Sequence, residues 1–199
     1  GYFYGCHNLK IELNSDRELR MLNFCANSGP FIIGGTGVFA FRYPGSSYGY
    51  YEQASIRNDG RFPIVVANAI KNVAEGNAIW AQSFSEGSIA AIGGMDTVNN
   101  PLCFGGDIRV GGAWQVADLR AQQCYGSMVA ARMSRLTVMP DATFEVRNQT
   151  AAQPFNTVGY AGLSVAANAT ATVSGTQFLM ESNNVHYIDG MLTVNCPLT

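Results

Sequence analysis

The sequence predicts an all-β fold, a right-handed parallel β-helix (solenoid) with coils of about 27–29 residues, and it does so through a repeated triplet and an alternating pattern. The triplet is apolar-x-apolar, and it occurs at residues 79–81, 108–110, 136–138, 163–165 and 192–194, so that successive starts are almost evenly spaced. Such a repeat is typical of stacked units whose apolar faces are buried only by their neighbours.

The alternating pattern indicates that the stacked units are strands. Residues 163–174, LSVAANATATVS, mostly alternate between apolar and polar, as a half-buried strand does. Thr, Val, Ser and Asn are also poor helix formers. We therefore expect Leu136, Leu163 and Leu192 at equivalent inward positions on successive coils.

One segment departs from the strand pattern. Val66, Ile70 and Val73 stand at helical spacing before Gly76, which is compatible with one short helix near residues 65–75. The valine content leaves a strand open as the alternative.

Residues 41–53, FRYPGSSYGYYEQ, are predicted to be an inserted loop. Triplets at 9–11 and 38–40 keep the common spacing, but the next triplet, at 79–81, begins well after the position that the period predicts. Pro, Gly and Ser in the extra stretch indicate turns, and insertions in repeat proteins form loops on one face, often the binding face. We expect residues 1–199 to form a single domain that is a fragment of a longer chain.

The inserted loop supplies the candidate substrate-binding residues. Tyrosine offers a flat apolar face for a sugar ring and a hydroxyl group for hydrogen bonding. The alternative is that these rings close a subunit interface or cover an edge of the fold. The candidates are Arg42, Tyr43, Tyr48, Tyr50, Tyr51 and Glu52.

A second pattern gives the candidate catalytic residues, Asp118 and Glu145. The tripeptides 118–120 and 145–147 are both acid-apolar-Arg, and one predicted period separates them. If Leu119 and Val146 stack inward, the two carboxyl groups stack outward on adjacent coils, and the pKa of one of them should rise, as a glycosidase acid requires. The alternative is a solvated ladder in which the neighbouring arginines neutralise the carboxylates.

Composition excludes several classes of function. Charged residues make up 13% of the chain, against about 25% in ordinary soluble proteins, and the net charge is −2 without a basic cluster, which argues against nucleic-acid binding. No apolar run is long enough for a membrane span. Five scattered cysteines and two histidines predict neither a disulfide framework nor a metal site, and no cofactor is expected.

The coiled repeat, the sparse charge, the unpaired cysteines and the Tyr-rich loop together resemble the β-helical tailspike and tail-fibre proteins of bacteriophages. The resemblance implies a homotrimeric, virion-associated receptor-binding protein that recognises a bacterial surface polysaccharide. It also implies assembly in the host cytoplasm and a place in the virion tail. Two alternatives remain open: a polysaccharide depolymerase, either hydrolase or lyase, and a ligand-free trimerisation or stalk segment of a fibre.

Overall fold

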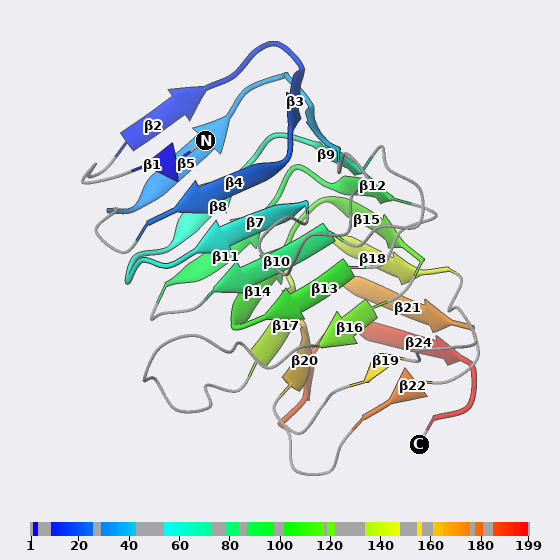
Figure 1. Ribbon diagram of the computed structural model, residues 1–199. Helices are drawn as coiled ribbons and strands as arrows, with labels where there is room; N and C mark the ends of the chain where they lie inside the picture. Colours follow the sequence, from blue (N-terminus) through cyan, green and yellow to red (C-terminus); the bar gives the residue numbers. More distant parts are fainter. Residues whose placement is uncertain are drawn as a thin grey trace, which may run out of the picture.

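The computed structural model is all-β, and no helix occurs in the part of the chain that it describes (Figure 1). The residues described are 2–3, 9–25, 29–42, 54–72, 79–83, 87–97, 102–117, 119–121, 134–147, 155–156, 161–175, 178–180 and 185–198.

The strands form three large sheets and one small one. Sheet A contains β1 (Tyr2–Phe3), β4 (Met21–Phe24), β7 (Ser55–Asn58), β10 (Ile79–Ser83), β13 (Leu102–Gly105) and β16 (Leu119–Ala121), in that order. Sheet B contains β2 (Leu9–Glu12), β5 (Phe31–Gly34), β8 (Ile64–Val66), β11 (Ser88–Ala91), β14 (Asp107–Val110), β17 (Ser134–Val138), β20 (Ala161–Val165) and β23 (Tyr187–Ile188). Sheet C contains β3 (Arg17–Leu19), β6 (Phe39–Phe41), β9 (Ile70–Asn72), β12 (Met95–Thr97), β15 (Ala113–Val116), β18 (Thr143–Val146), β21 (Thr170–Ser174) and β24 (Met191–Asn195). The small sheet D pairs β19 (Phe155–Asn156) with β22 (Phe178–Leu179).

Neighbours within each sheet are three strands apart in the chain, and the paired strands are parallel. The chain therefore visits sheets A, B and C in turn, and β19 and β22 follow β16 below sheet A in Figure 1. We call each set of three consecutive strands a coil.

The hydrophobic core is built from inward side chains that stack from coil to coil. In sheet B, Ile108, Leu136 and Leu163 are in register, and each is at most 2% exposed. In sheet C, Trp114 and Phe144 are in register and are equally buried. Burying one such side chain contributes about 1.5–3 kcal/mol, so the stacked core is the main source of stability.

The stacking of Leu136 on Leu163 confirms one part of the predicted repeat, but the expected position of Leu192 is wrong. Leu192 is paired with Ala171 in sheet C. The uniform period is wrong too. Ile89, Ile108 and Leu136 are in register, although far fewer residues separate Ile89 from Ile108 than separate Ile108 from Leu136. Strands keep their register while the connections between them vary in length, which costs little free energy.

The expected stacking of Leu119 on Val146 is also wrong. Leu119 is paired with Leu102 in sheet A. Val146 is paired with Val116 and Val173 in sheet C. The two tripeptides are one predicted period apart in the sequence, but Leu119 and Val146 lie in two different sheets.

The short helix suggested near residues 65–75 is absent from the residues described there. Val66 ends β8 in sheet B, and Ile70 begins β9 in sheet C; both side chains are buried. Val66 and Ile70 are spaced like residues on one face of a helix because a short corner separates these two inward-pointing strand residues. Val73 and Ala74 lie outside the described residues.

The long alternating stretch at 163–174 is two strands joined by a corner. Ala171 and Val173 point inward as predicted, but Ala167 is exposed in the corner between β20 and β21. Asn168 adopts a φ of 63° there. An extended strand has a negative φ, so the polypeptide turns at this residue.

The corners between sheets B and C are short and repeat this geometry. Gly35, Gly94, Gly112 and Asp141 also have positive φ at the same corner in other coils. The fully buried Asn68 joins three coils here, because its Nδ2 donates to the carbonyl oxygens of Leu13, at 3.1 Å, and Gly37, at 2.8 Å. Buried amides with such partners hold sheets B and C in a fixed relation.

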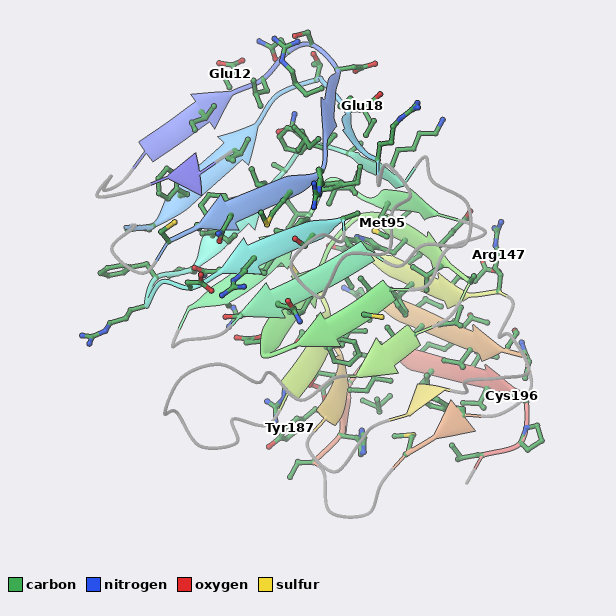
Figure 2. The ribbon with its side chains drawn as sticks, viewed as in Figure 1. Glu12, Glu18, Met95, Arg147, Tyr187 and Cys196 are labelled. Atoms are coloured by element: carbon green, nitrogen blue, oxygen red, sulfur yellow. The ribbon has the colours of Figure 1, made fainter. Side chains whose placement is uncertain are left out.

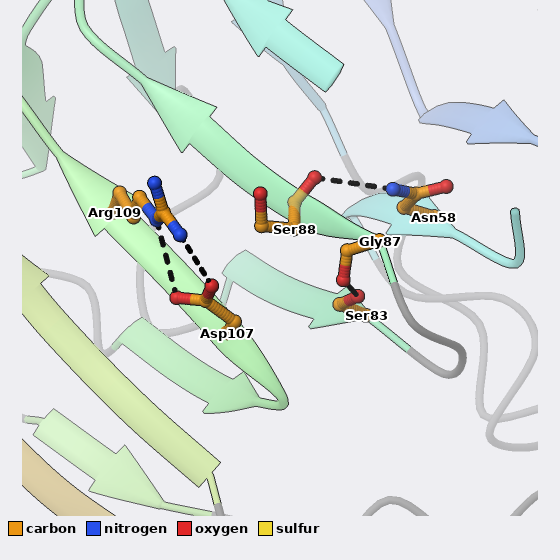
Figure 3. Close-up of polar contacts among 6 residues, drawn as sticks. All are labelled: Asn58, Ser83, Gly87, Ser88, Asp107 and Arg109. Atoms are coloured by element: carbon orange, nitrogen blue, oxygen red, sulfur yellow. Dashed lines mark hydrogen bonds and ion pairs between the residues drawn. The ribbon is translucent and has the colours of Figure 1, made fainter. Parts of the chain in front are cut away.

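Buried polar side chains also fix the corner between sheets A and B (Figure 3). Asn58 Nδ2 donates to the carbonyl oxygens of Phe62, at 2.9 Å, and Ser88, at 3.1 Å. The hydroxyl group of Ser83 donates to the carbonyl oxygen of Gly87. Sheet B is therefore held along both of its sides.

Candidate functional site: the outward face of sheet B

One column of outward-pointing residues runs the length of sheet B and changes character along it. Polar residues begin at β14 and continue to β23, after three apolar residues in β5, β8 and β11. In register, the column is Lys10, Ile32, Val65, Ala90, Arg109, Thr137, Ser164 and Tyr187. A second outward column beside it contains Asp107, Arg135 and Gly162 in register. We call the surface formed by Asp107, Arg109, Arg135, Thr137 and Tyr187 the polar face.

Asp107 and Arg109 form an ion pair on this face (Figure 3). They are two residues apart in β14, so both point outward. The Arg109 Nη2 and Nε atoms lie 2.9 and 3.4 Å from the two carboxylate oxygens of Asp107. The hydrogen bonds that Arg109 donates to Asp107 raise the pKa of Arg109, and the smaller effect of burial opposes this. Both side chains remain accessible to solvent, at 39% and 49%.

Arg135 and Tyr187 form a stack beside this pair. The guanidinium carbon of Arg135, in β17, lies 5.0 Å from the centre of the Tyr187 ring, in β23. Gly162 is opposite Arg135 on the intervening β20. A Cβ at Gly162 would lie 3.8 Å from the Arg135 Nε and only 2.7 Å from the Val185 carbonyl oxygen. Glycine is therefore required by the close approach of the Val185 backbone, and a Cβ would only touch the arginine side chain at an ordinary contact distance.

Tyr187 remains available for further contacts. Its side chain lies beside β20 on the outside of the sheets (Figure 2), and 52% of the residue is exposed. A cation over an exposed ring contributes roughly 0.5–1 kcal/mol. The contact therefore favours this arrangement of the two groups while leaving much of the ring exposed.

The charges on the polar face do not balance. Asp107 is neutralised by Arg109. Among the described residues, no carboxylate forms an ion pair with Arg135, whose side chain contacts the Tyr187 ring. The face therefore presents one positive charge that is not compensated there.

This arrangement suits saccharide binding. An aromatic ring can pack against the apolar face of a sugar, and planar charged groups and a hydroxyl group can hydrogen-bond to its substituents. On the polar face, Tyr187 is the aromatic ring, Arg135 and Asp107 are the planar charged groups, and Thr137 supplies the hydroxyl group. The side chains project from sheet strands, which hold them more rigidly than a loop would.

Of the candidates predicted in the inserted loop, the structure describes Arg42, which lies at sheet C and not on the polar face. Arg42 directly follows β6 and forms an ion pair with Glu18 of β3, with Nε and Oε1 3.0 Å apart. Both side chains are well exposed. Residues 42–54 connect β6 in sheet C to β7 in sheet A. The other candidates, Tyr43, Tyr48, Tyr50, Tyr51 and Glu52, lie outside the described residues.

The stacked carboxylates predicted at Asp118 and Glu145 rest on a register that is wrong. Glu145 is opposite Gln115 and Thr172 on the neighbouring strands of sheet C. It forms an ion pair with Arg147, with Oε2 and Nε 2.9 Å apart, and about 40% of each side chain is exposed. Glu145 is thus a solvated surface carboxylate, as the alternative interpretation proposed. Asp118 lies outside the described residues.

Sequence reasoning missed the polar face, although part of its signal was present. Asp107 and Arg109 flank the first apolar residue of one repeated triplet. Arg135 and Thr137 flank the first apolar residue of the next triplet. These positions served only to mark the repeat. Tyr187 could not be added to them, because its spacing from its register partner Ser164 is shorter than the predicted period.

Comparisons with models of known protein families, with curated proteins and with solved structures found no match for this chain. Within the described ranges, no three His, Cys, Asp or Glu residues gather where they could hold a metal ion. The same ranges contain no helix long and apolar enough to cross a membrane.

Proposed function

We propose that the chain is a right-handed parallel β-helix that binds a bacterial surface polysaccharide as a virion-associated receptor-binding protein. The return of every third strand to the same sheet supports the architecture. The observation that carries the binding function is the stack of Arg135 on Tyr187 beside the Asp107–Arg109 pair. The location in a virion tail follows only from the resemblance to tailspike and tail-fibre proteins.

The shape of the polar face supports a polymeric ligand. Its residues extend from β14 to β23, which are separated by three steps between paired strands. At the usual strand spacing this is about 14 Å. A strip of polar side chains of that length fits several consecutive sugar units better than a single ring.

Replacement of Tyr187 by alanine is the direct test of polysaccharide binding. We expect the variant to bind a responsive bacterial surface polysaccharide at least about fivefold more weakly, because stacking on an aromatic ring is worth roughly 1–3 kcal/mol. Tyr187→Phe should retain most of the binding, because it keeps the ring. Binding can be measured on an array of purified polysaccharides, followed by calorimetry.

The matched control is Met191→Ala, which removes a similarly exposed side chain, 56% accessible, from sheet C in the same coil. It should leave binding unchanged. If the wild-type chain binds no polysaccharide on the array, the proposed function is wrong and the ligand-free stalk is favoured. If Tyr187→Ala binds as well as wild type, the site lies elsewhere, and the tyrosines of residues 41–53 are the next to test.

The apolar part of the same column supports the homotrimer. Ile32 and Val65 are in register on sheet B and point outward, and Ile32 is 47% exposed. Phe62 and Ile92, in the adjoining corners, are 46% and 38% exposed. We propose that copies of the chain bury this strip against one another in a closed assembly, which leaves no apolar strip exposed. The number of three copies follows from the resemblance to tailspike and tail-fibre proteins.

Light scattering tests the assembly. We expect the wild-type chain to have three times the protomer mass of 21.4 kDa. Ile32→Lys should shift it towards the protomer, because a buried unpaired ammonium group opposes association. Thr172→Lys, on the outside of sheet C, is the control. A wild-type protomer mass at micromolar concentration would contradict the trimer.

The depolymerase alternative receives no support from the residues described. Glu145 is surrounded by Gln115, Thr172 and Arg147, and none of these is a second carboxyl group. We therefore propose binding without assigning a catalytic pair.

A further inference from the structure

Arg135 contacts the Tyr187 ring but has no anionic partner among the described residues. The central carbon of its guanidinium group lies over the Tyr187 ring, 5.0 Å from the ring centre, and this is the side-chain interaction that the described part of the chain gives it. A guanidinium group has five N–H donors arranged around its edge, and those of Arg135 donate no hydrogen bond within the described residues. The donors that suit a planar acceptor are therefore left for a ligand.

The neighbouring charges make an anion the best ligand for that edge. Asp107 is opposite Arg135 in the register and would repel an anion, but its two carboxylate oxygens are both bonded to Arg109. A neutral sugar would leave the charge of Arg135 without a counter-charge. A carboxylate would form charge-assisted, bidentate hydrogen bonds with it.

From this geometry we infer that the polar face recognises an acidic saccharide, in which a sugar unit carries a carboxylate. The inference rests on the proposed polysaccharide binding and specifies its ligand. The carboxylate pairs with the edge of Arg135, and the apolar face of a neighbouring sugar ring packs on Tyr187. The hydroxyl group of Thr137, two residues from Arg135 on the same strand, is placed to bind a sugar hydroxyl.

The experiment compares an acidic ligand with its neutral counterpart. The full chain is titrated with oligosaccharides prepared from a panel of uronic-acid polymers, and with the same oligosaccharides after chemical reduction of the carboxyl groups to alcohols. We expect the acidic forms of at least one polymer to bind about tenfold more tightly or better. The difference should shrink as the salt concentration rises.

Variants then assign the difference to Arg135. Arg135→Gln should lose about tenfold in affinity for the acidic form and should bind the neutral form as wild type does. Arg135→Lys should recover only part of the loss, because lysine lacks the planar fork. Arg147→Gln is the matched control, since Arg147 is an exposed arginine of sheet C and should not affect either ligand. Circular dichroism should show wild-type folding in all three variants.

The outcomes distinguish a failure of the inferred acidic ligand from a failure of the proposed polysaccharide binding. Equal or tighter binding of the neutral forms, or an Arg135→Gln variant that keeps the acidic preference, overturns the acidic ligand while polysaccharide binding stands. If the phosphate groups of a phosphodiester-linked glycan bind tightly and uronates do not, an anion is bound but the carboxylate is wrong. If none of these probes and no polysaccharide on the array binds, the proposed function itself fails.

Discussion

Val146→Asp is expected to prevent folding. Val146 is completely buried and is in register with Val116 and Val173, which are also buried. A carboxylate at this position would be surrounded by valine side chains without a partner. We expect the free energy of unfolding to fall by roughly 5 kcal/mol or more, a large share of the total stability of a typical domain. Far-UV circular dichroism and urea unfolding would measure the loss.

Thr172→Asp is the control for this variant. Thr172 lies on the adjacent strand, opposite Glu145, and points outward. The new carboxylate would be solvated, and its repulsion by Glu145 should cost no more than about 1 kcal/mol. If the two aspartate variants are damaged equally, the inward and outward faces of sheet C are assigned wrongly.

Asn68→Ala is expected to be the second most damaging change. The amide of Asn68 donates to two carbonyl oxygens, of Leu13 and Gly37, and so joins three coils. Alanine would leave both oxygens without this donor in a corner where Asn68 is 0% exposed. The Leu13 oxygen keeps the hydrogen bond that the Gly37 backbone N–H donates to it at 3.0 Å, so the Gly37 oxygen is the group that loses its partner. A buried group left unsatisfied costs about 1–3 kcal/mol, and we expect a loss of about that size in urea unfolding.

Asn14→Ala provides the comparison at the same corner of an earlier coil. Asn14 is exposed, and its Oδ1 accepts a hydrogen bond from the Thr36 backbone at 3.2 Å. Water can replace that bond, so the expected loss is below about 1 kcal/mol. Similar, small losses in both variants would mean that Asn68 does not hold the corner together.

The strand pattern of the sequence predicts which way side chains point, because the pleat of a strand places alternate residues on opposite faces. This is why Ala171 and Val173 are buried as expected while Thr172 points outward. The pattern cannot locate the corners. Ala167 continues the alternation on paper, but it is exposed because the chain turns at Asn168.

The register between coils could not be obtained from a fixed period. Sheet B aligns Ile108 with Leu136 and Ile89 with Ile108, although the second interval is much shorter. The difference lies in the connections, whose length is only weakly constrained by stability. The variable length of the connections is also why a fixed period predicted the wrong position for Leu192 and a pairing of Asp118 with Glu145 that rests on the wrong register.

The polar face depends on this register and was therefore hidden in the sequence. Arg135, Gly162 and Tyr187 belong to three neighbouring strands at unequal spacing in the sequence, so only the register brings the arginine to the tyrosine ring. Each of these residues is inconspicuous by itself. The Tyr-rich stretch, by contrast, stands out in the sequence, and its tyrosines lie outside the described residues.

The polar face exists only if every third strand enters the same sheet, and a distance measurement tests that arrangement most directly. Gln115 and Thr193 lie in one outward column of sheet C, through Glu145 and Thr172. Spin labels can be attached there through non-natural amino acids, which leaves the native cysteines unchanged. We predict a backbone separation of about 14 Å, three strand spacings, by electron paramagnetic resonance. A separation of more than roughly twice that value would contradict the register and, with it, the assembly of the polar face.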